Sequence, residues 1–245
     1  MLVILSHSGA KTIEIDCQKN GGTGLITAEL VDAHGVWTRD VHLAQTKLIV
    51  LENTIDGHVM PLKNIKRIID LAAQRDCLVH MDGARIWHAA VATNVPVLEM
   101  CTGLNSVSLC FSKGLGAPVG SVLAGSSELI DKARYLRKIW GGGWRQAGGL
   151  AAACIYALDN NIDRLKIDHK VAKELSDELR HRGYKVEQSE TNMVWVENND
   201  PDIEAKMDKR GVNVFGGAKM RIVVHFQNHA GVSALLDGFP MIKDS

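Results

Sequence analysis

The stretch SVSLCFSKGLGAPVGS, residues 106–121, joins an apolar run to a glycine-rich loop that carries one lysine, Lys113. The run 106–111 predicts a strand, and 121–124 predicts another strand after the loop. Lys113 would then follow the carboxyl end of a buried strand, where ligands bind in open α/β sheets. There we expect the ammonium to lose its water and the pKa of Lys113 to fall. The neutral amine would become a nucleophile able to form a Schiff base.

The segment before this loop alternates strand-like and helix-like patterns. Apolar runs at 48–51 and 77–81 predict two strands, and Pro61 opens a helix between them. The apolar side chains of that helix recur at helical spacing: Leu62, Ile65, Ile68, Ile69 and Ala72. Short apolar strands separated by helices indicate βαβ units and a mainly parallel sheet that is buried on both faces. We therefore expect an α/β protein.

Polar residues follow the predicted strands. Glu52, Asp82 and Lys113 stand at or just after three strand ends, and the carboxyl ends of parallel strands meet at one edge of a sheet. A carboxylate such as that of Asp82 can hold the ring nitrogen of pyridoxal phosphate in its protonated form, so that the ring acts as an electron sink. The structural alternative is that Asp82 caps the helix that follows.

The second half of the chain predicts a separate α+β layer. Helices are expected at 128–138, 145–158, 168–180 (capped by Asp168) and 202–209, with a short final helix at 231–236. Strands are expected at 185–187, 193–197, 213–215 and 221–226. This change of pattern predicts two domains, a large domain at 1–160 and a smaller C-terminal α+β domain at 161–245.

The overall composition excludes several classes of partner. Lys plus Arg and Asp plus Glu number 28 each, so we expect neither a nucleic-acid surface nor an acidic membrane as a partner. The five cysteines show no metal-ligand spacing, so no metal site is expected and a reducing compartment is favoured. Residues 1–5 are too short for a secretory signal or a membrane span, and they predict a strand. We expect a cytoplasmic protein, or a mitochondrial one if a segment precedes residue 1.

Three motifs in this order carry a family resemblance. They are DGAR at 82–85, SKGLGAPVG at 112–120 and GGGWRQAG at 141–148. Together they closely resemble the low-specificity L-threonine aldolases, which are fold-type-I pyridoxal-phosphate enzymes, and the resemblance runs from about residue 42 to residue 226. It implies a partial large domain of the aspartate aminotransferase type, because relatives carry a further segment before this point.

The resemblance implies roles for individual residues around the cofactor. Lys113 would carry the covalent link to pyridoxal phosphate, and Asp82 would pair with its ring nitrogen. Arg145 would bind the phosphate, with Lys138 as a second cation that relatives contribute across a subunit boundary. Arg85 would contact the substrate carboxylate or the phenolic edge of the cofactor.

Two further residues would act on the substrate. Arg221 would clamp the substrate carboxylate through two parallel hydrogen bonds. His42 would accept the proton of the substrate hydroxyl, directly or through a water. Structural alternatives stay open for each of these charges: a strand-edge charge for Arg221, a solvated helix surface for Lys138 and Arg145, and an exposed loop for His42.

The implied reaction is retro-aldol cleavage of L-threonine or L-allo-threonine to glycine and acetaldehyde, in a homodimer or homotetramer with shared sites. Two alternatives remain. The chain could be a catalytically impaired, truncated homologue that acts only as a partner subunit. It could also be a pyridoxal-phosphate-dependent lyase that eliminates the β-substituent of an amino acid.

Overall fold

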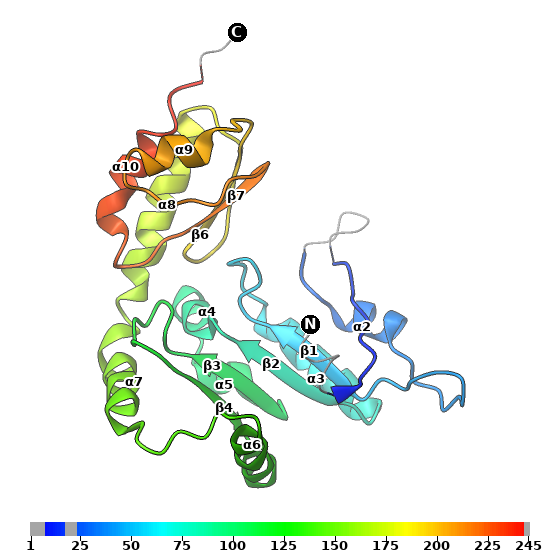
Figure 1. Cartoon of the computed structure of the whole chain (residues 1–245). Coiled ribbons are helices and arrows are strands. Elements are labelled where there is room, and N and C mark those ends of the chain that lie inside the picture. Colours follow the sequence, from blue (N-terminus) through cyan, green and yellow to red (C-terminus); the bar gives the residue numbers. More distant parts are fainter. Residues whose placement is uncertain (1–7, 18–23, 243–245) are drawn as a thin grey trace.

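A computed structural model describes residues 8–17 and 24–242 of the chain. These residues form two parts, each built on its own sheet and hydrophobic core (Figure 1). The first part contains α2 (Ala28–His34), β1 (Leu48–Glu52), α3 (Leu62–Gln74), β2 (Leu78–Gly83), α4 (Ile86–Thr93), α5 (Val97–Cys101), β3 (Ser106–Cys110), β4 (Ser121–Gly125), α6 (Ser127–Ile139) and α7 (Gly148–Asn161). The second contains α8 (Leu165–His181), β5 (Val186–Gln188), β6 (Met193–Glu197), α9 (Ile203–Asp208), β7 (Lys219–Val223), the 3-10 turn η2 (His229–Gly231) and α10 (Val232–Leu236).

The first sheet has the strand order β1-β2-β3-β4. The first three strands run parallel, and β4 returns antiparallel to β3. Helices connect the parallel strands, because such strands need a crossover to return to the same end of the sheet. The expectation of an α/β fold with a mainly parallel sheet is confirmed.

One face of this sheet is packed and the other is bare. Ile49, Leu51, Val79 and Met81 are at most 5% exposed and belong to the core that α3 and α4 complete. Leu48, Val50 and Leu78 alternate with them and are 51%, 48% and 54% exposed. Successive side chains of a strand point to opposite faces. The prediction of a sheet buried on both faces is therefore wrong for the described part of the chain.

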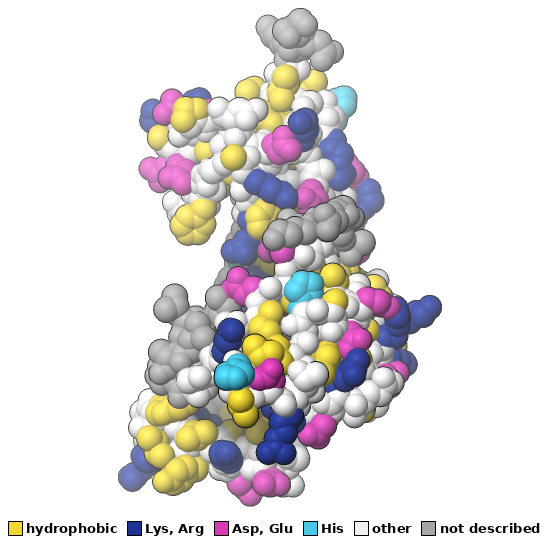
Figure 2. Space-filling view, turned by 90° about the vertical axis from the view of Figure 1, so that its right-hand side faces the viewer, with side chains coloured by type: hydrophobic (Ala, Val, Ile, Leu, Met, Phe, Trp, Pro, Cys, Tyr) yellow, Lys and Arg dark blue, Asp and Glu magenta, His cyan; other side chains and the backbone are white. Residues whose placement is uncertain are grey.

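The helices of the first part show how the sequence pattern becomes packing. Helix α3 starts directly after Pro61, and its apolar stripe buries Ile65, Ile68 and Ala72 against the sheet. Helix α6 is capped by Ser126, whose side chain accepts the amide of Leu129, and it buries no residue. The exposed surface of α6 and the following loop is where hydrophobic side chains gather at the lower end of the molecule (Figure 2).

The second part is an antiparallel sheet in the order β5-β6-β7, covered by α8, α9 and α10. The prediction of a strand at 213–215 is wrong: these residues form no strand, and the sheet consists of β5, β6 and β7 alone among the described residues. The expected cap of α8 by Asp168 is also wrong. Asp168 lies inside the helix, fully buried, and its Oδ1 lies 2.8 Å from His229 Nε2.

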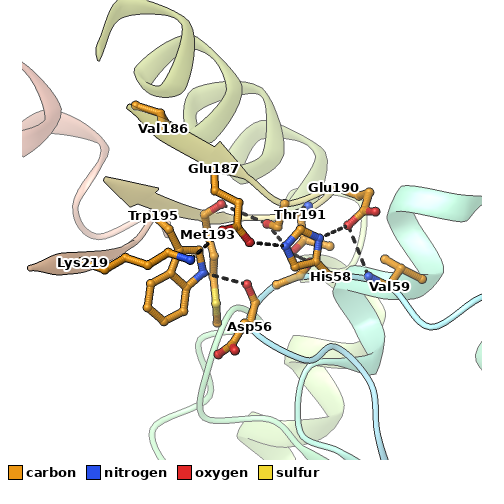
Figure 3. Close-up of polar contacts among 12 residues, drawn as sticks. Asp56, His58, Val59, Val186, Glu187, Glu190, Thr191, Met193, Trp195 and Lys219 are labelled. Carbon is orange, nitrogen blue, oxygen red and sulfur yellow. Dashed lines mark hydrogen bonds and ion pairs between the residues drawn. The ribbon is translucent and has the colours of Figure 1, made fainter. Parts of the chain in front are cut away.

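The two parts meet through polar contacts that Figure 3 shows. The ring of His58 lies between two carboxylates, with Nε2 3.1 Å from Glu187 Oε1 and Nδ1 3.1 Å from Glu190 Oε2. The Thr191 hydroxyl donates to the Gly57 carbonyl over 2.6 Å. The chain passes from one part to the other between α7 and α8, and the division at residues 160 and 161 stays a prediction.

The described residues lack a membrane-spanning helix and a metal-binding cluster. None of the helices there is both long and apolar enough to cross a lipid bilayer. Within the same ranges no group of His, Cys, Asp and Glu side chains is arranged to hold a metal ion. The strand predicted at residues 1–5 lies outside the described residues.

Candidate functional site

The carboxyl edge of the parallel sheet gathers the acidic residues that the sequence placed at strand ends. Glu52 lies directly opposite Asp82 in the register of β1 and β2, and Asp82 lies opposite Ser108 of β3. Lys113 follows β3 by three residues. The three strand ends therefore present two carboxylates and one amine at the same edge.

Asp82 is held by a local backbone contact. Its Oδ1 accepts the amide N–H of Ala84 over 2.9 Å, while Oδ2 has no hydrogen-bond partner among the described residues. Asp82 does not cap α4, because the N-cap position is occupied by Arg85 and receives no side-chain hydrogen bond. The Oδ2 atom of Asp82 is thus available to accept a hydrogen bond from a ligand.

Charges of both signs crowd this edge. Burial, with the Asp82 and Asp56 charges, raises the pKa of Glu52, although Arg85 and Lys113 oppose that shift. Burial lowers the pKa of Arg85, and the nearby Arg221 guanidinium lowers it further. Two guanidinium groups close enough to repel each other form a place where a carboxylate anion would be stabilised.

Arg221 reaches this edge from the second part of the molecule. It lies on β7 beside Trp195 of β6, and its guanidinium carbon is 5.9 Å from the centre of the indole ring. The indole N–H of Trp195 donates to the carbonyl of Asp56 over 3.0 Å, a contact that Figure 3 shows. Trp195 therefore ties the strand pair that carries Arg221 to the loop after β1.

Lys113 is exposed, which corrects the expectation that its ammonium would lose its water. Its side chain makes no hydrogen bond or ion pair with the residues that the structure describes. The backbone around it is ordered by short contacts: the Gly116 amide donates to the Lys113 carbonyl over 2.8 Å, and the Ala117 amide donates to the Phe111 carbonyl over 3.0 Å. Backbone hydrogen bonds thus determine the geometry of this loop. The Lys113 ammonium would lose its water only if another molecule or subunit covered the carboxyl edge of the sheet.

The structure does not join the predicted phosphate cations to Lys113. Lys138 lies in the last turn of α6 and Arg145 in the loop before α7, and both are exposed. The aliphatic part of Lys138 lies so close to Gly143 that a Cβ there would come within 2.5 Å of its Cδ. Within the described ranges no contact connects either cation to the Lys113 loop.

His42 lies away from the other predicted residues. It is exposed in the loop that precedes β1, and its amide N–H donates to Asp40 Oδ1 over 2.8 Å. This loop extends from the amino ends of the parallel strands, whereas Lys113 follows a carboxyl end (Figure 1). One chain therefore does not bring His42 and Lys113 together.

Sequence reasoning missed the side chains that pack behind the lysine loop. His88 is 2% exposed, and its Nδ1 lies 2.9 Å from Nε2 of His169. The Nη2 of Arg164 donates to the carbonyl of Gly114 over 3.0 Å. Gly114 and Gly116 could have indicated that other side chains pack against this loop, because glycine permits close approach by another group.

Comparison with known proteins adds independent findings. A family model described as β-eliminating lyase matches residues 3–200. The chain is 41% identical over 195 residues to the low-specificity L-threonine aldolase of Candida albicans, covering 77% of this chain and 51% of that protein. It is 45% identical over 206 residues to a probable low-specificity L-threonine aldolase of Schizosaccharomyces pombe, covering 82% and 54%. The chain thus spans about half the length of these curated relatives.

Solved structures agree with the fold. A Leishmania major threonine aldolase superposes with a TM-score of 0.75 at 16% identity, covering 93% of this chain and 69% of that one. A putative L-allo-threonine aldolase from Listeria monocytogenes gives a TM-score of 0.69 at 21% identity, covering 88% and 64%. At these identities the superpositions show a shared fold.

Proposed function

The chain belongs to the β-eliminating lyase family, and from that premise we propose that it is a pyridoxal-phosphate-dependent aldolase that cleaves L-threonine and L-allo-threonine to glycine and acetaldehyde. The observation that carries this proposal is the meeting of Lys113, Asp82 and Arg85 at one sheet edge, with Arg221 beside Arg85. The relatives named as threonine aldolases support the choice of substrate.

The residues at this edge fit the reactive end of pyridoxal phosphate. Lys113 offers a primary amine to the aldehyde, and the free Oδ2 of Asp82 can accept a hydrogen bond from a protonated ring nitrogen. When bound, the cofactor supplies an electron sink that stabilises a carbanion on the α-carbon of an amino acid. Asp82 keeps the ring nitrogen protonated, and the paired guanidinium groups of Arg85 and Arg221 orient the substrate through its carboxylate.

The positions of Lys138 and Arg145, the predicted phosphate-binding cations, support a site that is shared between subunits. Lys138 and Arg145 remain apart from Lys113 within one chain, and they lie in a surface rich in exposed aromatic and aliphatic side chains: Tyr135, Ile139, Trp140, Trp144 and Tyr156. Large apolar side chains exposed in such number on neighbouring segments of the chain mark an interaction site. We propose that a homodimer or homotetramer covers it and brings these cations to the phosphate.

His42 keeps its proposed role only in such an assembly. An imidazole can accept the hydroxyl proton of the substrate when it lies within hydrogen-bond reach. Because His42 lies at the amino side of the sheet, it can serve only the site of a second copy. A cytoplasmic location remains part of the same proposal.

Product analysis tests this function. The chain, loaded with pyridoxal phosphate, is incubated with L-threonine, and glycine and acetaldehyde are measured together; equal amounts are expected, with none from Lys113→Ala. The description of the family favours a second candidate, elimination of the β-substituent of an amino acid. Pyruvate and ammonia from L-serine, without glycine from threonine, would favour that reaction. If the chain forms neither glycine from threonine nor pyruvate from serine, the remaining hypothesis is that it acts only as a partner subunit.

A further inference from the structure

The loop that carries Lys113 is held from behind by side chains of the segment that leads into the second part. Arg164, at the N-cap position of α8, donates from Nη2 to the Gly114 carbonyl over 3.0 Å. Asn161, at the end of α7, donates from Nδ2 to the Leu115 carbonyl over 2.7 Å. Two consecutive carbonyls after Lys113 are therefore fixed by side chains more than forty residues away in the sequence.

The same loop is packed so closely that only glycine fits at two positions. A Cβ on Gly114 would lie 2.3 Å from His88 Nε2, and a Cβ on Gly116 would lie 2.7 Å from a ring carbon of Phe226. Gly116 also has a φ of +73°, which side-chain-bearing residues rarely adopt. The loop therefore rests directly on these two aromatic rings.

Phe226 links the loop to the strand that carries Arg221. The guanidinium carbon of Arg164 lies 3.7 Å from the centre of the Phe226 ring, a close cation–π contact. Phe226 follows β7 by three residues, and Arg221 lies within β7. A chain of direct contacts thus runs from the Lys113 loop through Arg164 and Phe226 to the end of the Arg221 strand.

We propose that Arg164 and Phe226 are positioning residues that fix the turn at Gly114–Gly116 and so aim Lys113 relative to Arg221. The reason lies in Lys113 itself. Its side chain is exposed and makes no polar contact among the described residues, so the direction in which it leaves the loop depends on the backbone alone. The orientation of Lys113 matters for catalysis only if the proposed function holds, so this inference rests on that function. The claim that Arg164 and Phe226 order the loop rests on the contacts described above.

The predicted consequence is a loss of order in one loop, without general unfolding. The Nε of Arg164 is buried without a hydrogen-bond partner among the described residues, so the guanidinium is held by the Gly114 carbonyl and the Phe226 ring. A hydrogen bond from a charged donor contributes enough to change a local opening equilibrium by about tenfold or more. Arg164→Gln and Phe226→Leu should each release the loop by such a factor, and Arg164→Lys should restore part of the order.

Hydrogen exchange measured on the chain of residues 1–245 tests this release. The amides of Phe111, Gly116 and Ala117 are hydrogen-bonded within the loop and report on it directly. Arg182→Gln is the matched control, because Arg182 is also half-buried and donates to a backbone carbonyl, that of Phe239, over 3.0 Å. We expect exchange at 111–117 to be about tenfold faster in Arg164→Gln and unchanged in Arg182→Gln. Unchanged exchange in Arg164→Gln, or equal acceleration in the control, would overturn the inference.

A second readout separates this inference from the proposed function. The chain is treated with pyridoxal phosphate and then with borohydride, and the share of label on Lys113 is compared with the share on other lysines. Arg164→Gln should lower the Lys113 share several-fold, and Arg164→Lys should raise it again. If the unchanged chain carries no label on Lys113, the proposed function fails, and the exchange result still decides whether Arg164 holds the loop. If the unchanged chain is labelled and Arg164→Gln is labelled equally, the positioning role is refuted.

Discussion

A buried histidine behind the lysine loop, His88, makes the stability of this chain depend on pH. His88 is 2% exposed, and its Nε2 has no hydrogen-bond partner within the described residues. Burial, then the neighbouring His169 and the Arg85 charge, lower the pKa of His88 to about 3. The folded chain therefore holds His88 neutral over a range in which the unfolded chain would protonate it.

The sign and size of the effect follow from this difference. Between the ordinary histidine pKa of 6.5 and about 3, the unfolded chain binds more protons at His88 than the folded chain, so the free energy of unfolding falls as the pH falls. From about pH 7 to about pH 5, the His88 contribution amounts to about 2 kcal/mol. His169, whose pKa burial lowers to about 4, acts in the same direction but is more exposed to solvent.

Urea unfolding of His88→Asn tests the magnitude. We expect the unchanged chain to lose about 2 kcal/mol more stability than His88→Asn between about pH 7 and about pH 5, because asparagine does not titrate there. His181→Asn is the matched control, since it removes a histidine that is exposed at the end of α8 instead of buried. Equal pH dependence in the unchanged chain and in His88→Asn would refute the account of a neutral, desolvated His88.

Three further substitutions test the packing and the site. Gly114→Ala should lower the free energy of unfolding by about 1–3 kcal/mol, because the added methyl would meet His88 Nε2 at 2.3 Å, whereas Gly148→Ala, with no atom within 4 Å, should not lower it. Ile65→Ala, at a fully buried position, should cost about 2–5 kcal/mol in the same urea measurement. Arg221→Gln should raise the threonine concentration needed for half-maximal cleavage by about tenfold or more in a steady-state assay; an unchanged value would remove Arg221 from the carboxylate site.

Local patterns predicted the sheet well. The apolar runs that end in Glu52 and Asp82 became β1 and β2, paired so that these two carboxylates lie opposite each other. Parallel pairing at a common edge follows from the alternation of strands and helices, and both can be read in the sequence. The placement of Lys113 after β3 was predicted on the same ground.

Long-range partners could not be predicted in the same way. Asp168 has the sequence pattern of a helix cap, yet it lies inside α8 opposite His229, which is 61 residues away. The contacts of Arg164 with Gly114 and Phe226 likewise join segments that no local pattern connects. The exposure of Lys113 depends on what covers the sheet edge, which the residues around it do not determine.

Covalent trapping at Lys113 tests the central claim most directly. The chain is incubated with pyridoxal phosphate, reduced with borohydride, digested, and mapped by mass spectrometry. We expect one dominant phosphopyridoxyl adduct on the peptide that contains Lys113, and we expect it to be lost in Lys113→Ala and weakened in Asp82→Asn. An adduct spread evenly over exposed lysines such as Lys47, or no adduct on Lys113, would contradict it.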